Sequence, residues 1–215
     1  MSIVQMLYNN GHIMHSPFFD MVELPNEYWV YDFTRRFSEW DCPYDFQIGR
    51  YDETRPGMYE TELFKGERNH HVGIDIGAPV GTPIRAFADG KIHSFAYEEE
   101  EGGYGNLIIT QHNVKFPDDA EHEWAGKEKT VWVLCGHLSS NSIENIHVGK
   151  DILAGETYCW MGDRHENGNW EPHVHIQITF EKPIVANMPG VVNIGDRDEA
   201  IEKYPDPRII LGNLY

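Results

Sequence analysis

The pattern of apolar and polar residues along the chain is typical of β-strands. Short runs rich in β-branched and aromatic residues are separated by Gly and Pro, which favour turns. Strands are expected within residues 74–76, 81–86, 90–95, 105–110, 130–135 and 173–178. The number and spacing of these runs predict a mainly β fold, a sandwich or barrel.

The run at 173–178 has the clearest alternation of polar and apolar residues, which predicts a strand with one polar face. Side chains two residues apart point to the same side of a strand, so His173 and His175 share that face, about 6.6 Å apart. Pro172 cannot donate to a central ladder, so the strand is expected to begin there. Two imidazoles are therefore directed toward one region.

A second polar pair, His71 and Asp75, is four residues apart in a segment that is a poor helix. In a straight strand these side chains would lie about 13 Å apart, too far to share a metal ion. The chain is therefore expected to bend at Gly73, which tolerates backbone angles that other residues avoid. His70, the residue before this pair, is expected to be exposed to solvent.

Residues 1–45 are rich in aromatic residues with irregular spacing, and one short helix is expected near 31–37. We interpret them as an N-terminal extension that packs on a single domain, residues 46–215, whose motifs lie within 70–180. A lip that contacts substrate is the alternative interpretation. The acidic run at 98–101 is expected to be a solvated hairpin tip.

Composition narrows the range of partners. A formal charge of −18 repels phosphate backbones and anionic lipids, so nucleic acid and membrane surfaces are not expected as partners. No apolar run is long enough to span a bilayer, and the N-terminus lacks a secretory signal. The chain as read is expected to be cytoplasmic, or periplasmic or secreted if a signal was removed. Three cysteines without a C-x-x-C pair are expected to be reduced thiols.

The candidate chemistry is metal-assisted hydrolysis. A catalytic zinc ion takes three protein ligands and keeps one position open. His71, Asp75 and one of His173 or His175 supply such a set, and spacing alone does not decide between the paired histidines. His137 follows an apolar strand, where catalytic groups are often held. Cys135, two residues earlier, allows a cysteine nucleophile as an alternative.

Five motifs in order resemble the lysostaphin/LytM-type zinc metallopeptidases, which mostly cut peptide bonds in bacterial peptidoglycan cross-links. They are His71-Val-Gly-Ile-Asp75-Ile, Gly81-Thr-Pro-Ile84 with Ala88-Asp-Gly-Lys-Ile92, Gly103-Tyr-Gly-Asn106, Gly136-His-Leu-Ser139 and Pro172-His-Val-His175. The resemblance covers about residues 70–180.

This resemblance implies an antiparallel β-sandwich or barrel with the site in a groove. It implies that His71, Asp75 and His175 hold Zn2+ and that His137 and His173 assist catalysis. The implied reaction is endopeptidase hydrolysis of an amide bond, in peptidoglycan-type peptides, through a zinc-activated water.

The chain departs from the common pattern in the loop 162–170, in its missing export signal and in its negative charge. These departures leave a non-wall peptide or amide as an alternative substrate. A non-catalytic metal-binding or regulatory module, an iron(II) oxygenase and a structural zinc site are rival interpretations. The sequence does not indicate an oligomeric state.

Overall fold

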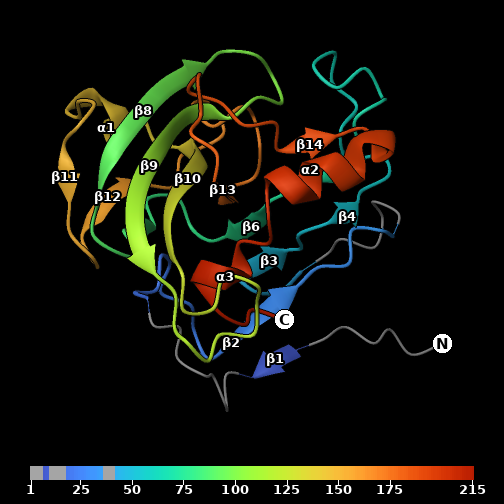
Figure 1. Ribbon diagram of the computed structural model, residues 1–215. Coiled ribbons are helices and arrows are strands. Elements are labelled where there is room, and N and C mark those ends of the chain that lie inside the picture. The colour runs from blue at the N-terminus through green and yellow to red at the C-terminus, as the bar shows by residue number, and fades with distance from the viewer. Residues whose placement is uncertain (1–6, 10–17, 36–41) are drawn as a thin grey trace.

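Antiparallel strands are the predominant regular elements in the computed structural model, which describes residues 7–9, 18–35 and 42–215 (Figure 1). The strands are β1 (Leu7–Asn9), β2 (Glu27–Val30), β3 (Gln47–Gly49), β4 (Glu53–Thr54), β5 (His70–His71), β6 (Ile74–Gly77), β7 (Pro83–Arg85), β8 (Gly90–Glu98), β9 (Gly105–Lys115), β10 (Glu128–Leu138), β11 (Asp151–Ile152), β12 (Thr157–Trp160), β13 (His173–Thr179) and β14 (Val191–Val192). The helices are α1 (Asn141–Glu144), the 3-10 helix η2 (Ile194–Asp196), α2 (Arg197–Lys203) and α3 (Arg208–Leu211). The mainly β class is confirmed.

Nine of these strands form one large sheet in the order β1-β2-β3-β6-β13-β10-β9-β8-β11. The pair β2–β3 is parallel, and the other pairs in the sheet are antiparallel. The two outermost described strands, β1 and β11, are not neighbours, so the sheet is open and does not close into a barrel. Smaller sheets, β12-β7 and β14-β5-β4, complete the described architecture.

Both faces of β9 and β10 are buried over much of their length, which explains why residues 107–109 and 131–135 read as continuous apolar runs. In β9, Ile108 belongs to one apolar cluster while Leu107 and Ile109 belong to another. Strands β7 and β12 contribute to the first cluster, and β14 and α2 contribute to the second. The large sheet is therefore the middle layer, and polar side chains that replace an apolar residue on either face become buried.

The predicted strands are confirmed, and most run further than the sequence pattern indicated. The helix expected near 31–37 is wrong for residues 31–35, which form a turn, and residues 36 and 37 lie outside the described residues. Tyr28 of β2 is fully buried and donates a hydrogen bond to the carbonyl of Leu214 at 3.0 Å. The division into residues 1–45 and 46–215 stays a prediction.

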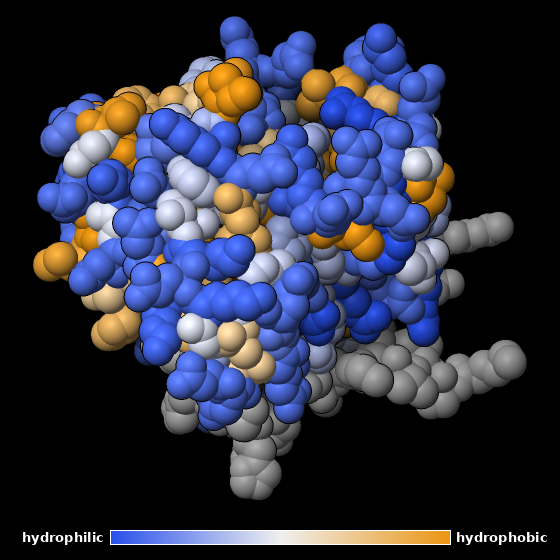
Figure 2. Space-filling view, in the orientation of Figure 1, coloured by the Kyte–Doolittle hydropathy of each residue, from blue (hydrophilic) through white to orange (hydrophobic). Residues whose placement is uncertain are grey.

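The face of the molecule in Figure 2 is mostly hydrophilic, with apolar side chains in small separate patches. Within the described residues no helix is both long and apolar enough to cross a membrane. All three cysteines are free thiols, as expected, and Cys135 and Cys159 are buried.

Glycine allows the loop 162–170 to approach the start of β9. A Cβ on Gly105 would lie 2.2 Å from the carbonyl oxygen of Glu166, and Gly105 has a positive φ of 60°. Gly81 has a positive φ of 80° as well, but a Cβ there would meet nothing within 4 Å. The two glycines therefore share one backbone requirement and differ in packing.

Gly105→Ala is expected to destabilise the fold more than the matched control Gly81→Ala. The left-handed conformation costs about 1–2 kcal/mol for either alanine, and overpacking adds about 1–3 kcal/mol at position 105. Urea unfolding of both variants measures the difference in the free energy of unfolding. Equal losses would contradict the close approach of the loop.

Candidate metal centre and catalytic groups

Strand register places two of the predicted ligands side by side. In the antiparallel pair β6–β13, Asp75 lies directly opposite His175, and Gly77 lies opposite His173. Alternation along β13 sends Val174 and other apolar residues into one core cluster, so the histidines face the other side of the sheet. A one-residue slip would bury the wrong set of side chains, so this register is strongly specified.

His71 reaches the same place because the chain turns between β5 and β6, as the sequence predicted. The physical role of Gly73 in this turn differs from the expected one, because its φ is not positive. A Cβ on Gly73 would lie 2.3 Å from Cε1 of His175. Glycine is needed here to give the imidazole of His175 room beside the backbone.

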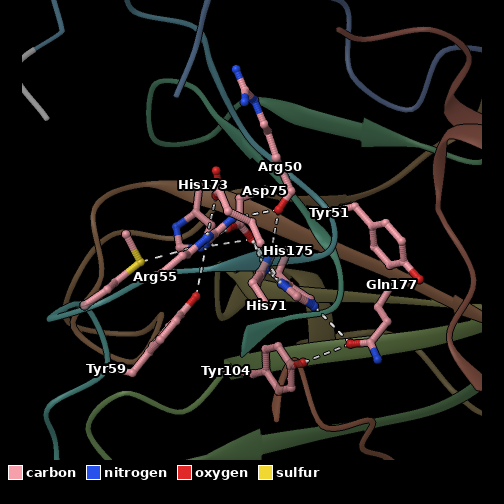
Figure 3. A network of polar contacts seen from close by, with 12 residues as sticks. Arg50, Tyr51, Arg55, Tyr59, His71, Asp75, Tyr104, His173, His175 and Gln177 are labelled. Carbon is pink, nitrogen blue, oxygen red and sulfur yellow. Dashed lines mark hydrogen bonds and ion pairs between the residues drawn. The ribbon is translucent and has the colours of Figure 1, made fainter. Parts of the chain in front are cut away.

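Three ligating atoms converge at this point (Figure 3). The Nε2 atom of His71 lies 3.0 Å from Nδ1 of His175 and 3.2 Å from Oδ1 of Asp75, and the last two atoms are 3.0 Å apart. Two ligands of a tetrahedral zinc ion, each about 2.05 Å from it, lie about 3.3 Å apart. The observed separations therefore fit a shared small cation.

Hydrogen bonds on the far sides of the two rings determine where their protons lie. Nδ1 of His71 donates to the carbonyl of Arg50 at 2.9 Å, and Nε2 of His175 donates to Oε1 of Gln177 at 3.1 Å. The Gln177 amide is itself oriented, because its Nε2 donates to the carbonyl of Pro189. The two facing nitrogens are therefore unprotonated in the neutral rings, and their lone pairs point at the carboxylate. Such a set of acceptors fits a metal ion.

The charge states of Asp75 and His71 also suit metal binding. Burial opposes ionisation of Asp75, but His71 and Arg55 outweigh it and keep the pKa of Asp75 well below its ordinary value. Burial, together with the nearby Arg55 charge, lowers the pKa of His71 to about 3. Near neutral pH the site therefore holds a carboxylate and a neutral imidazole, which are the forms that bind metal. Among the described residues, no fourth His, Cys, Asp or Glu joins the set.

His137 and His173 lie beside these atoms, with ring centroids 4.3 Å apart. Nδ1 of His137 donates to the carbonyl of Asn167 at 2.7 Å, and Nδ1 of His173 donates to the carbonyl of Glu171 at 2.6 Å. Burial lowers the pKa of both rings. Each therefore carries an unprotonated Nε2 near neutral pH, and that of His173 is 3.9 Å from Oδ1 of Asp75. Both nitrogens can accept a proton.

A local distortion of β10 presents His137. The β9–β10 register shifts between Cys135 and Leu138, and His137 adopts a positive φ of 63°. A non-glycine residue in this region is uncommon and is held there by surrounding contacts. The neighbour Gly136 leaves room for the ring of Tyr104, since a Cβ would lie 2.3 Å from that ring.

The loop 162–170 holds the acceptor for His137. Asn167 is fully buried, and its side-chain amide donates to the carbonyls of Gly162 and Trp170 and accepts from the Trp170 amide. The loop 162–170 departs in sequence from the pattern of the lysostaphin/LytM-type peptidases. Its internal hydrogen bonds hold the carbonyl of Asn167 in place for His137.

The five predicted site residues line a groove with a volume of about 1300 Å³. They are His71, Asp75, His137, His173 and His175. One wall contains Tyr59, Phe64 and Trp170, which form a small apolar cluster with Val191. The acidic hairpin tip also reaches the groove through residues 98–100.

Sequence reasoning missed three polar residues around the site and misplaced a fourth. Gln177 shares the strand face of His173 and His175, so alternation could have identified it, whereas nothing in the local sequence indicated Arg55 or Asn167. His70 was expected to be exposed, but it is 2% exposed and contacts Asp52 at 2.8 Å. It lies on a short strand next to His71, and the two rings contact different partners.

The cysteine-nucleophile interpretation is wrong. The Cys135 thiol is fully buried in the core cluster that contains Val174 and lies 3.1 Å from the Tyr158 hydroxyl. Cys135 is not among the described residues that line the groove beside the histidines.

Comparisons with known proteins give a family match and several relatives. Residues 69–187 match Peptidase family M23. Over 107 residues, half of this chain, the sequence is 50% identical to the DD-carboxypeptidase/endopeptidase Mpg of Neisseria meningitidis serogroup B. Over 108 residues it is 32% identical to the glycyl-glycine endopeptidase ALE-1 of Staphylococcus capitis. These matches span 19% and 24% of the two relatives, so the chain corresponds to a minor part of each.

A structural comparison also matches the catalytic domain of lysostaphin from Staphylococcus simulans. That structure has a TM-score of 0.43 and 22% identity, with 72% of this chain and 92% of that chain covered.

Asn167→Ala is expected to reduce the free energy of unfolding by about 2–4 kcal/mol, because three hydrogen bonds, one buried and two partly buried, are lost and their backbone partners stay unsatisfied. Arg164→Ala, which removes an exposed ion pair to Glu171 in the same loop, is the control and should cost about 1 kcal/mol or less. Chemical denaturation measures both. A loss at Asn167 no larger than at Arg164 would contradict the role of this side chain in the loop.

Proposed function

Because the chain belongs to peptidase family M23, we propose that it is a zinc-dependent endopeptidase that hydrolyses an amide bond. Peptidoglycan-type cross-link peptides are the first-choice substrate. The convergence of His71, Asp75 and His175 beside two neutral imidazoles supports the proposal most directly. The five predicted side chains lie close together, which supports a catalytic role over a non-catalytic module.

His71, Asp75 and His175 would hold the zinc ion through the three atoms that already face one another. Zinc, when bound, supplies Lewis acidity that polarises the scissile carbonyl and acidifies water. Three protein ligands are the pattern of a catalytic zinc site, whereas a structural site is closed by four. A structural zinc interpretation is therefore less well supported.

The two remaining histidines would handle protons. With Nδ1 engaged by a backbone carbonyl, Nε2 of His137 or His173 accepts a proton from the attacking water. The resulting imidazolium then has an N–H at Nε2, which can stabilise the oxyanion and return the proton to the leaving amine. The backbone acceptors fix the ring orientations during both steps.

Two neighbouring histidines allow these tasks to be divided. His137 is held by the loop 162–170, while His173 is held by the carbonyl of Glu171 at the start of β13. Each ring therefore has its own anchor. Their close separation also means that protonation of one disfavours protonation of the other, which suits transfer of a single proton.

The substrate is the least constrained part of the proposal. The relatives' names refer to DD-carboxypeptidase/endopeptidase and glycyl-glycine endopeptidase activities. The net charge of −18 disfavours approach to an anionic polymer, which keeps a non-wall peptide or amide as a second candidate. A mass-spectrometric digest of purified wall fragments beside a general peptide mixture separates the two. Cleavage of the general peptides alone would favour the second.

Substitutions are expected to separate metal binding from turnover. Asp75→Ala or His175→Ala should abolish zinc occupancy, because each removes one of three ligands. His137→Ala should keep the zinc and lose about 10²–10⁴-fold in kcat, which is the usual contribution of a general acid–base group.

Elemental analysis of the purified variants, together with the peptide digest, measures these effects. His147→Ala is the matched control, since His147 is an exposed histidine outside the groove lining. Full activity in His137→Ala would rule out its assigned role, and zinc retained in His175→Ala would rule out the ligand set.

A further inference from the structure

Arg55 is almost completely buried, with 1% of its surface exposed, and it contacts a proposed metal ligand. Its Nη1 lies 2.6 Å from Oδ2 of Asp75 and 3.0 Å from the hydroxyl of Tyr59. Nε donates to Glu53 at 3.1 Å, and Nη2 donates to the carbonyl of Arg50 at 3.1 Å. All three guanidinium nitrogens therefore have partners, and the group is held in one orientation.

This contact divides the carboxylate of Asp75 between two tasks. Oδ1 faces His71 and His175, whereas Oδ2 faces Arg55 (Figure 3). A carboxylate held by a strong donor on one oxygen cannot rotate freely, so only the other oxygen is presented to the two histidines.

The backbone also leaves room for this ion pair. Gly49 of β3 lies opposite Asp75 in the sheet. A Cβ on Gly49 would lie 2.8 Å from Nη2 of Arg55 and 3.0 Å from Oδ2 of Asp75. The Phe33 ring covers the guanidinium from another side, with 4.8 Å between Cζ and the ring centroid. Two further segments, at Phe33 and at Gly49, thus enclose the ion pair between Arg55 and Asp75.

We propose that Arg55 is a positioning residue that orients Asp75 so that a single carboxylate oxygen binds the metal, a role that rests on the metal centre proposed above. Arg suits this task because its planar donor fork is always charged and can bind several acceptors at fixed angles. Lysine offers a point charge without the fork. Arg55 lies outside residues 69–187, the part of the chain that matches the family.

Two other roles for Arg55 make different predictions. If the guanidinium acted mainly as a positive charge, it would repel a divalent cation, and its removal would tighten metal binding. If it only stabilised the fold, its removal would lower the free energy of unfolding and leave the metal affinity of the folded protein unchanged. The metal affinity of folded variants therefore distinguishes positioning from both alternatives.

The experiment uses Co2+ as the probe, added to the full chain after chelation of bound metal, at one fixed pH. Calorimetry gives the dissociation constant, and the visible absorption of bound Co2+ reports ligand geometry. Arg55→Met is expected to weaken Co2+ binding about 10–100-fold, the usual effect of losing a partner of a metal ligand, and to change the spectrum.

Arg55→Lys keeps the charge but loses the fork, so it is expected to restore part of the affinity. Tyr59→Phe is the matched control: it removes one hydrogen bond from the same nitrogen of Arg55 and leaves the contact to Asp75 in place. The control should bind Co2+ within about threefold of the original chain, with an unchanged spectrum, since the carboxylate contact remains.

Unchanged or tighter binding by folded Arg55→Met would overturn the positioning role. If Arg55→Met does not fold, Arg55→Lys decides: affinity and spectrum equal to those of the original chain would overturn it. Failure of the metal centre itself has a different signature. The original chain would then bind no Co2+, or His175→Ala would bind it equally well.

Discussion

The cross-strand pair Asp75–His175 is the contact on which the rest of the site depends. Antiparallel pairing of β6 with β13 brings a carboxylate and an imidazole together on one face of a buried sheet, and the apolar face of β13 fixes the register. Every other functional group is placed relative to this pair. His71 is turned toward it by the bend before β6, Arg55 holds the far oxygen of the carboxylate, and Gln177 holds the far nitrogen of the imidazole.

Close backbone approach, more than unusual backbone angles, makes this arrangement possible. Gly73 leaves space for His175, Gly136 leaves space for the ring of Tyr104, and Gly49 leaves space for the Arg55–Asp75 ion pair. A side chain at any of these positions would displace a functional group. Positive φ matters at different places, in particular at His137, where the distorted end of β10 turns the imidazole toward the groove. The strain of that residue is balanced by the hydrogen bond to Asn167 in a loop that is itself well anchored.

Much of this could be predicted from the sequence because the local patterns are strong. Alternation in residues 173–178 identified the strand and the shared face of His173 and His175. A straight strand would have kept His71 and Asp75 too far apart to share a metal ion, so a bend between them was expected. Local patterns could not show what only tertiary structure decides. Arg55 lies 20 residues before Asp75 in a polar segment, and it contacts Phe33, from another part of the chain, as well as the nearby Tyr59. His70 was misplaced because a two-residue strand is too short to show which face is covered. The helix near 31–37 was inferred from local residue spacing alone, and residues 31–35 form a turn instead.

The position of β3 has a practical consequence for dissecting the chain. Sequence similarity alone would define residues 69–187 as the fragment to produce. However, β6 receives its second neighbour from β3, through Ile48 opposite Ile76 and Gly49 opposite Asp75. A fragment that starts at residue 69 would leave that edge of β6 without its partner and would uncover the apolar surface under Ile48. Unpaired strand edges of this kind promote association between copies. The smallest soluble unit should therefore extend well upstream of the homologous region, and truncation boundaries are better chosen from strand pairing than from sequence similarity.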